Sequence, residues 1–199
     1  MNIIHLGTEY GGWQVDIDSI HDGDLIIDAG LGEDISFIER LSQIKKVKIV
    51  GVDPTIKSHL YVESKNMTNL SLLKKAIHKK GVEKITMFRN SNPNYVSESY
   101  LSDHSSVFSS SYDIECVSFK ELIETYNPTL IKMDIEGGEY DVLSECIGVK
   151  QVCVEFHHHC IDSKSFKDTI DCINMMESND YRIIANRNNI EFTFLKKSL

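Results

Sequence analysis

Short apolar runs alternate with amphipathic segments along most of the chain, and this alternation restricts the fold more than any other feature. The runs that predict strands cover residues 24–30, 46–53, 84–90, 129–135 and 150–156. Apolar residues at helical spacing predict helices over 34–44, 68–80, 139–147 and 164–177, and residues 114–126 predict a strand that runs into a helix. Strands and helices that alternate in this way form a mainly parallel sheet with helices on both faces. Two final runs, 181–187 and 190–197, predict an antiparallel hairpin.

Length and charge exclude several classes of protein. A chain of 199 residues can bury one sizeable core, so we expect a single domain over residues 1–199. The net charge of -9 argues against a nucleic-acid partner, because general nucleic-acid binding requires a basic surface. No apolar run approaches the roughly 20 residues of a membrane span, and no signal peptide is visible at the start, so we expect a cytoplasmic protein. The oligomeric state is left open by the sequence.

Residues 90–113 interrupt the alternation. The segment is rich in Ser and Asn, and its aromatic residues are Tyr95, Tyr100, Phe108 and Tyr112. A loop of this length inside a compact domain is usually functional or disordered. We therefore expect a loop on the substrate side, and we expect residues 1–20 to form an N-terminal arm.

A glycine turn follows the first predicted inner strand. Asp28 ends the strand, Gly30 and Gly32 form the turn, and the next helix begins near Asp34. Glycines at this place let the backbone approach a ligand at the carboxyl end of a strand, where open sheets bind ligands. Asp53 ends the following strand, and a carboxylate there suits a ribose diol. Together these residues predict a cofactor that contains a nucleoside.

The charge of this turn indicates which cofactor. A dinucleotide fingerprint would require a third glycine at position 35, which is Ile35. Glu33 and Asp34 stand where a pyrophosphate would bind the helix N-terminus, and two carboxylates there repel phosphates. S-adenosylmethionine carries a sulfonium and an ammonium and no phosphate, so the sequence favours it as the cofactor.

The segment Leu130–Leu143 places three carboxylates around two glycines at the end of a predicted strand. We expect Asp134 to point into the cleft and Glu136 to accompany it in the chemistry. The glycines permit a sharp bend, and Glu139 suits the first turn of the following helix as well as it suits a site.

These motifs resemble the FkbM family of S-adenosylmethionine-dependent methyltransferases over nearly the whole chain. The resemblance is carried by "IKMDIEGGEYDVL", "IDAGLGEDISF", "GVDP", "VSFKELIE", "VCVEFH" and "GTEYGGW". It implies an α/β, Rossmann-like class I methyltransferase fold with a seven-stranded sheet whose last strand is antiparallel. It also implies O-methylation of an acceptor hydroxyl, on a sugar or glycan or on a small natural product.

The resemblance also assigns roles to individual residues. Asp28, Gly30 and Gly32 would line the methionine end of the donor, and Asp53 would hold its ribose. Asp134 would face the sulfonium or the acceptor. At the position where many methyltransferases carry a third glycine this chain has Asp34, which shifts the expected contact with the donor's carboxylate towards Tyr10, Gly11 and Gly12. Asp34 itself is also expected to contact the cofactor.

A hydroxyl acceptor must lose its proton during methyl transfer. His157 is the first candidate for the base and Asp134 the second, while a divalent cation bound by Asp134, Glu136 and His157 would serve instead as a Lewis acid. The sequence leaves these alternatives open. A nicotinamide-dependent oxidoreductase and a non-catalytic domain that binds a nucleoside cofactor remain as competing functions.

Overall fold

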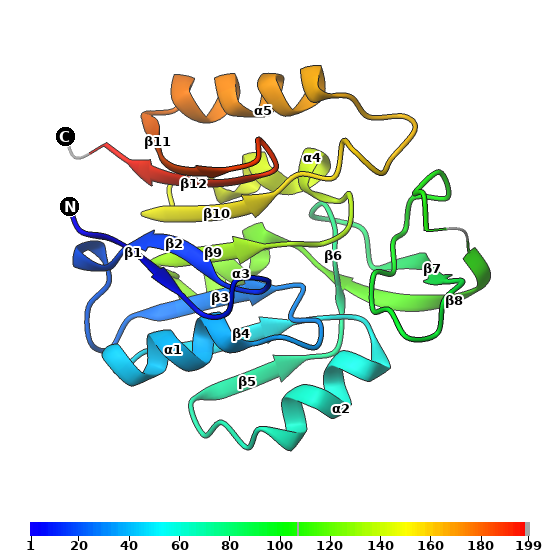
Figure 1. Cartoon of the computed structure of the whole chain (residues 1–199), viewed down its shortest axis with the longest axis horizontal. Coiled ribbons are helices and arrows are strands. Elements are labelled where there is room, and N and C mark those ends of the chain that lie inside the picture. Colours follow the sequence, from blue (N-terminus) through cyan, green and yellow to red (C-terminus); the bar gives the residue numbers. More distant parts are fainter. Residues whose placement is uncertain (107, 198–199) are drawn as a thin grey trace.

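The computed structural model describes residues 1–106 and 108–197, and a seven-stranded sheet forms the centre of this part of the chain (Figure 1). Its strand order is β11-β12-β10-β9-β3-β4-β5. The strands are β3 (Leu25–Ala29), β4 (Lys48–Val52), β5 (Leu70–Leu73), β9 (Leu130–Met133), β10 (Gln151–Glu155), β11 (Tyr181–Arg187) and β12 (Glu191–Lys196). Strand β12 is antiparallel to both of its neighbours, whereas the pairs from β10 to β5 are parallel. The predicted class I methyltransferase fold is confirmed.

Apolar side chains cover both faces of this sheet. The helices are α1 (Ser36–Ile44), α2 (Ile56–Ser64), α3 (Phe119–Tyr126), α4 (Glu139–Val142) and α5 (Phe166–Ser178), with 3-10 turns at Ile17–Ser19 and Leu143–Cys146. Ile26 packs with Leu41 of α1 on one face, and Ile27 packs in a separate core with Phe119 of α3 and Ile173 of α5 on the other. Successive strand residues point to opposite faces, which explains why these buried strands are mostly apolar.

The predicted helix over 68–80 is wrong. Leu70–Leu73 forms edge strand β5 and Ala76–Ile77 forms the short strand β6, whereas the preceding helix, α2, was not predicted. Leu70 pairs in register with Ile49 of β4 and packs in the core beside α1. Tertiary pairing with β4 therefore overrides the helical spacing of the apolar residues.

Two predicted strands leave the main sheet. β7 (Lys84–Asn90) and β8 (Phe108–Val117) pair with β6 in a three-stranded sheet of order β6-β8-β7, beyond the carboxyl ends of the parallel strands (Figure 1). β8 starts at Phe108, so the expected loop over 90–113 is shorter at its end than predicted, and Val107 within it lies outside the described residues.

The N-terminal arm is a hairpin of β1 (Ile3–Leu6) and β2 (Trp13–Asp16), which packs beside α1. Its connecting turn reaches the carboxyl end of the main sheet. Within the stretches that the structure describes, none of the helices has the length and apolar character that a bilayer crossing requires.

Candidate active site

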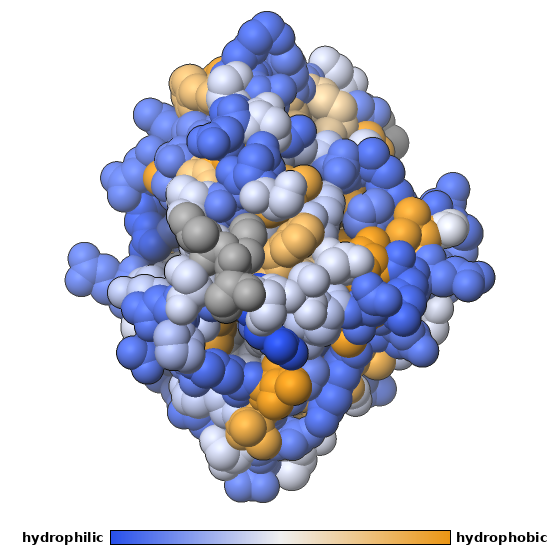
Figure 2. Space-filling view, turned by 90° about the vertical axis from the view of Figure 1, so that its right-hand side faces the viewer, coloured by the Kyte–Doolittle hydropathy of each residue, from blue (hydrophilic) through white to orange (hydrophobic). Residues whose placement is uncertain are grey.

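A cavity of about 420 Å³ opens at the carboxyl ends of β3, β4, β9 and β10. Its walls come from the glycine turn after β3, from the segment after β9, from the loop between β7 and β8, and from the N-terminal turn. Figure 2 shows the molecule from this side, where the surface is largely hydrophilic with a few apolar patches. The volume is within the range of pockets that enclose small ligands.

The glycine turn is fixed against the chain that follows β9. Gly30 has a φ of +78°, and a Cβ added to it would lie 1.6 Å from the carbonyl oxygen of Asp134. Only glycine fits such a close backbone approach. Gly32 also has a positive φ, and its amide donates to Asp53 Oδ2 at 3.0 Å. Gly30, Gly32, Asp53 and Asp134 all line the cavity, so the structure brings these predicted residues together.

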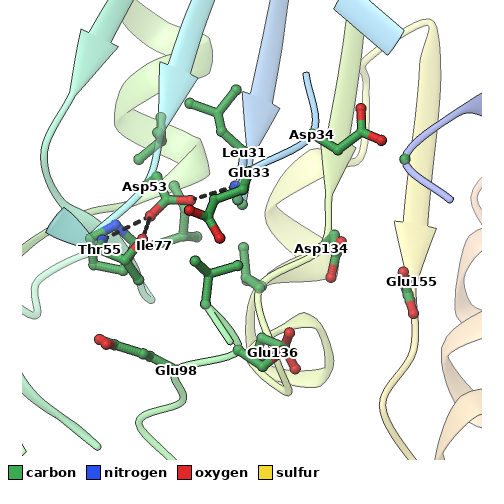
Figure 3. Close-up of a pocket in the computed structure, with 18 of the residues that line it drawn as sticks. Leu31, Glu33, Asp34, Asp53, Thr55, Ile77, Glu98, Asp134, Glu136 and Glu155 are labelled. Atoms are coloured by element: carbon green, nitrogen blue, oxygen red, sulfur yellow. Dashed lines mark hydrogen bonds between the residues drawn. The ribbon is translucent and has the colours of Figure 1, made fainter. Parts of the chain in front are cut away.

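Asp53 is almost fully buried at the end of β4. Its Oδ1 accepts hydrogen bonds from the amide and the hydroxyl of Thr55, at 2.8 and 2.7 Å. Figure 3 shows the carboxylate between Thr55 and the glycine turn. These three hydrogen bonds hold the carboxylate in one orientation at the cavity wall.

Asp34 joins the N-terminal turn to α1. It accepts from the Thr8 hydroxyl at 2.6 Å and from the Ser36 amide at 2.9 Å. Burial opposes ionisation, but the hydrogen bonds from Ser36 and Thr8 lower the pKa of Asp34. Asp34, Tyr10 and Gly11 line the cavity, and Tyr10 is 86% exposed at its edge.

Two predicted cofactor residues are not on the cavity wall. Gly12 lines a neighbouring pocket behind the N-terminal turn. Asp28 is buried below the glycine turn, with its Oδ1 3.4 Å from Lys132 Nζ. Lys132 also donates to the carbonyl oxygen of Gly30 at 2.5 Å. Asp28 therefore supports the turn through Lys132, and its expected direct contact with the donor stays a prediction.

Three carboxylates surround the Nε2 atom of His157, a buried residue that follows β10. Asp134 Oδ1 and Glu136 Oε2 both lie 3.5 Å from it, and Glu155 Oε1 lies 4.0 Å from it. Figure 3 shows Asp134, Glu136 and Glu155 on neighbouring segments of the cavity. On the other side of the ring, His157 Nδ1 donates to Glu139 Oε1 at 2.8 Å. The predicted catalytic residues His157, Asp134 and Glu136 thus form one cluster.

The pKa values of this cluster depart from their ordinary range. Burial opposes protonation of His157, but Glu139, Glu136 and Asp134 outweigh it and raise the pKa of His157. Burial and the nearby Asp134 raise the pKa of Glu155 to about 8. Perturbed groups of this kind in a cleft indicate a functional site.

A family model decides the identity of this fold. The model described as "Methyltransferase FkbM domain" matches residues 26–183, which run from within β3 to the start of β11 and include the acidic cluster. The chain belongs to the FkbM methyltransferase family. This family confirms the predicted methyltransferase class and, with it, S-adenosylmethionine as the methyl donor.

Solved structures that resemble this FkbM domain have the same fold at low sequence identity. A precorrin-6Y C5,15-methyltransferase from Geobacter metallireducens GS-15 has a TM-score of 0.50 at 9% identity, over 89% of this chain and 82% of that one. A magnesium protoporphyrin IX methyltransferase from Synechocystis PCC 6803, solved with bound S-adenosylmethionine, has a TM-score of 0.50 at 11% identity, over 91% of this chain and 74% of that one. An rRNA methylase from Streptococcus thermophilus has a TM-score of 0.50 at 9% identity, over 91% of each chain. No curated protein sequence matches the chain.

Sequence reasoning missed two charged residues that line the cavity of this FkbM domain. Lys132 is a charged residue inside an apolar strand, and this signal could have revealed it, because a buried lysine requires an acidic partner. Glu98 lies on the loop between β7 and β8 and lines the cavity opposite the cluster. In the sequence Glu98 is one polar residue among many in this loop, so no pattern singled it out.

Proposed function

We propose that this FkbM domain transfers the methyl group of S-adenosylmethionine to a hydroxyl oxygen of an uncharged or cationic acceptor, such as a sugar, a glycan or a small natural product. One observation carries the proposal: the cavity that starts at the glycine turn is strongly acidic. Among the residues that the structure describes, eight Asp and Glu side chains line it, against three Lys and Arg side chains. Of the basic residues, Lys132 is paired with Asp28 and Arg187 with Glu191.

This charge supports a cationic donor and argues against a phosphate-bearing acceptor. A carboxylate close to a sulfonium stabilises the positive charge, whereas a phosphate in the same cavity would be repelled. Carboxylates also accept hydrogen bonds from the hydroxyl groups of a polyol. For the same reason we propose no nucleic-acid acceptor, although one structural neighbour is an rRNA methylase.

We assign the donor to the side of the cavity formed by Gly30, Gly32 and Asp53, with the ribose on Asp53 and the carboxylate end near Tyr10 and Gly11. The acceptor then occupies the side of Asp134 and Glu136. In the reaction the oxygen forms a bond to the methyl carbon as the bond from carbon to sulfur breaks, and the hydroxyl proton leaves. Holding the three atoms in line can supply roughly 7–11 kcal/mol of the acceleration.

Binding of the donor product is the first test. Trp13 is the sole tryptophan and lines the cavity, so its fluorescence reports occupancy. We expect saturable binding of S-adenosylhomocysteine and none of NADH. Asp53→Asn replaces a carboxylate oxygen that accepts hydrogen bonds with an NH₂ group. The Kd of this variant for S-adenosylhomocysteine should therefore rise about tenfold or more. Asp162→Asn, at an exposed acid outside the cavity, is the matched control and should bind like the wild type. Tight NADH binding without S-adenosylhomocysteine binding would favour an oxidoreductase.

The position of the transferred methyl group is the second test. The chain is incubated with methyl-labelled S-adenosylmethionine and a panel of neutral, cationic and phosphorylated hydroxyl compounds, and the products are mapped by mass spectrometry. We expect label on oxygen, and only with acceptors that carry no phosphate. Label on nitrogen or carbon, or transfer to phosphorylated compounds alone, would contradict the proposal.

A further inference from the structure

We propose that Asp134, Glu136 and His157 bind one divalent cation of the Mg²⁺ and Mn²⁺ class on the acceptor side of the cavity. Their candidate ligand atoms all lie within 4.8 Å of one another. The two carboxylate oxygens lie 3.5 Å from His157 Nε2, close to the roughly 3 Å between neighbouring ligands of an octahedral ion with bonds of about 2.1 Å. Small side-chain shifts therefore suffice to bring the three atoms around one ion.

The His157 ring is oriented as a metal-binding imidazole would be. Glu139 is fully buried, and its Oε1 accepts from His157 Nδ1 at 2.8 Å and from the amides of Ile135 and Gly137. This contact leaves Nε2 to face Asp134 and Glu136. A carboxylate behind a histidine that fixes its tautomer is the usual second partner in metal sites. Among the described residues, the other oxygen of Glu139 is buried without a hydrogen-bond partner.

The two carboxylate ligands are also held by neighbours. Glu136 Oε2 receives a hydrogen bond from His104 Nε2 at 3.2 Å, and Lys132 Nζ lies 3.8 Å from Asp134 Oδ2. Glu136 itself has a φ of +55°, which is uncommon for a residue with a side chain and costs energy. The fold therefore keeps this carboxylate against His157 at the expense of backbone strain.

The surroundings favour a cation in this position. Glu139 and Glu155 add two further carboxyl groups around the three proposed ligands, at 2.8 and 4.0 Å from the His157 ring nitrogens. Carboxylate oxygens and one imidazole nitrogen suit a hard or borderline divalent ion, and thiolates, which would select softer metals, are absent from the proposed set. Asp134 is 32% exposed and Glu136 23% exposed towards the cavity, so the remaining coordination positions would face the acceptor.

The use of this cation in catalysis rests on the proposed function. A hydroxyl oxygen on the ion becomes more acidic, so the acceptor loses its proton to water in the open cavity. The oxygen then takes the methyl group from sulfur, and the balance is acceptor hydroxyl plus S-adenosylmethionine giving methyl ether, S-adenosylhomocysteine and one proton. His157 then acts as a ligand, and the base that the sequence suggested is not required.

The test measures Mn²⁺ binding by the metal-free chain, by electron paramagnetic resonance of free Mn²⁺ and by calorimetry. We expect one ion per chain and a Kd at least about tenfold weaker in Glu136→Gln, the range for lost metal-site partners. The matched control is Glu98→Gln, which removes one charge from the same cavity. Glu98 accepts a hydrogen bond from the Tyr112 hydroxyl and lies apart from the cluster (Figure 3). The Kd of the Glu98→Gln variant for Mn²⁺ should therefore change by less than about threefold, the size of a screened long-range charge effect.

Two results would overturn the site. The first is absence of Mn²⁺ binding up to about 1 mM, a free energy near -4 kcal/mol; an imidazolium of His157 paired with the carboxylates would then fill the cluster. The second is equal weakening by Glu136→Gln and Glu98→Gln, which would indicate general charge attraction. Binding of S-adenosylhomocysteine, read from Trp13 in the same samples, separates these failures from a failure of the proposed function.

Discussion

Gly30→Ala is expected to prevent folding, or to lower the free energy of unfolding by more than about 4 kcal/mol, a size reserved for severe structural conflict. The new Cβ would lie 1.6 Å from the carbonyl oxygen of Asp134 and 2.7 Å from its carbonyl carbon. Neither side can move freely. The Gly30 amide donates to Val52, and the Asp134 amide donates to Ala29, so both segments are tied to the central strands.

Gly81→Ala is the matched control for this substitution. Gly81 has a φ of +91°, similar to the +78° of Gly30, but an added Cβ there would meet nothing within 4 Å. It should therefore cost only the roughly 1–2 kcal/mol of left-handed backbone strain. Urea unfolding followed by circular dichroism compares the two variants. If the free energies of unfolding of the Gly30→Ala and Gly81→Ala variants differ by less than about 1 kcal/mol, the contact between the glycine turn and Asp134 yields more easily than the structure implies.

The parallel sheet could be predicted because its strands are buried on both faces. Ile26 and Ile27 belong to two different cores, so adjacent residues of this strand are both apolar, and a glycine follows the strand. Neighbouring runs have the same character, and the chain between them is long enough for a crossover. Local pattern and global fold agree at these positions, which is the condition under which sequence reasoning succeeds.

The region after β4 shows where that reasoning fails. Apolar residues from Leu70 to Ile77 fit a helical period, yet Leu70 pairs with Ile49 and Ala76 pairs with Cys116. Both pairings join segments far apart along the chain, and no local pattern encodes them. A short apolar run does not distinguish a strand from a helix by its period alone.

The candidate site could be predicted in part. Residues that end strands, such as Asp53 and Asp134, had to meet at one edge of the sheet, and they line one cavity. The side to which a strand-end residue points depends on register, which the sequence does not give. Asp28 illustrates this, because it pairs in register with Lys132 of β9, and Lys132 lines the cavity whereas Asp28 does not.

Lys132→Met is expected to lower the free energy of unfolding by about 3–5 kcal/mol, the cost of leaving a buried charge without its partner. Asp28 and Lys132 are 3% and 6% exposed, and within the part of the chain that the structure describes Asp28 Oδ1 has no hydrogen-bond partner. Burial already raises the pKa of Asp28, and Lys132 is the largest influence that lowers it. Without the lysine the pKa of Asp28 in the folded state rises further above its unfolded value. The loss of stability is therefore largest at high pH, where the folded protein must bury a charged carboxylate, and it fades as the pH falls towards the unfolded pKa of Asp28. Urea unfolding should therefore show a smaller loss at pH 5 than at pH 8.

The control is the double variant Asp28→Val/Lys132→Met, because an apolar pair of similar volume often replaces a buried ion pair without loss. It should recover most of the stability that Lys132→Met loses, and equal stability of the single and double variants would contradict the pairing. Lys132 also donates to the Gly30 carbonyl, and the double variant does not restore that hydrogen bond. Its binding of S-adenosylhomocysteine should therefore stay weaker than that of the wild type even where its stability is recovered. Together the two measurements separate the contribution of Lys132 to folding from its contribution to the shape of the donor turn.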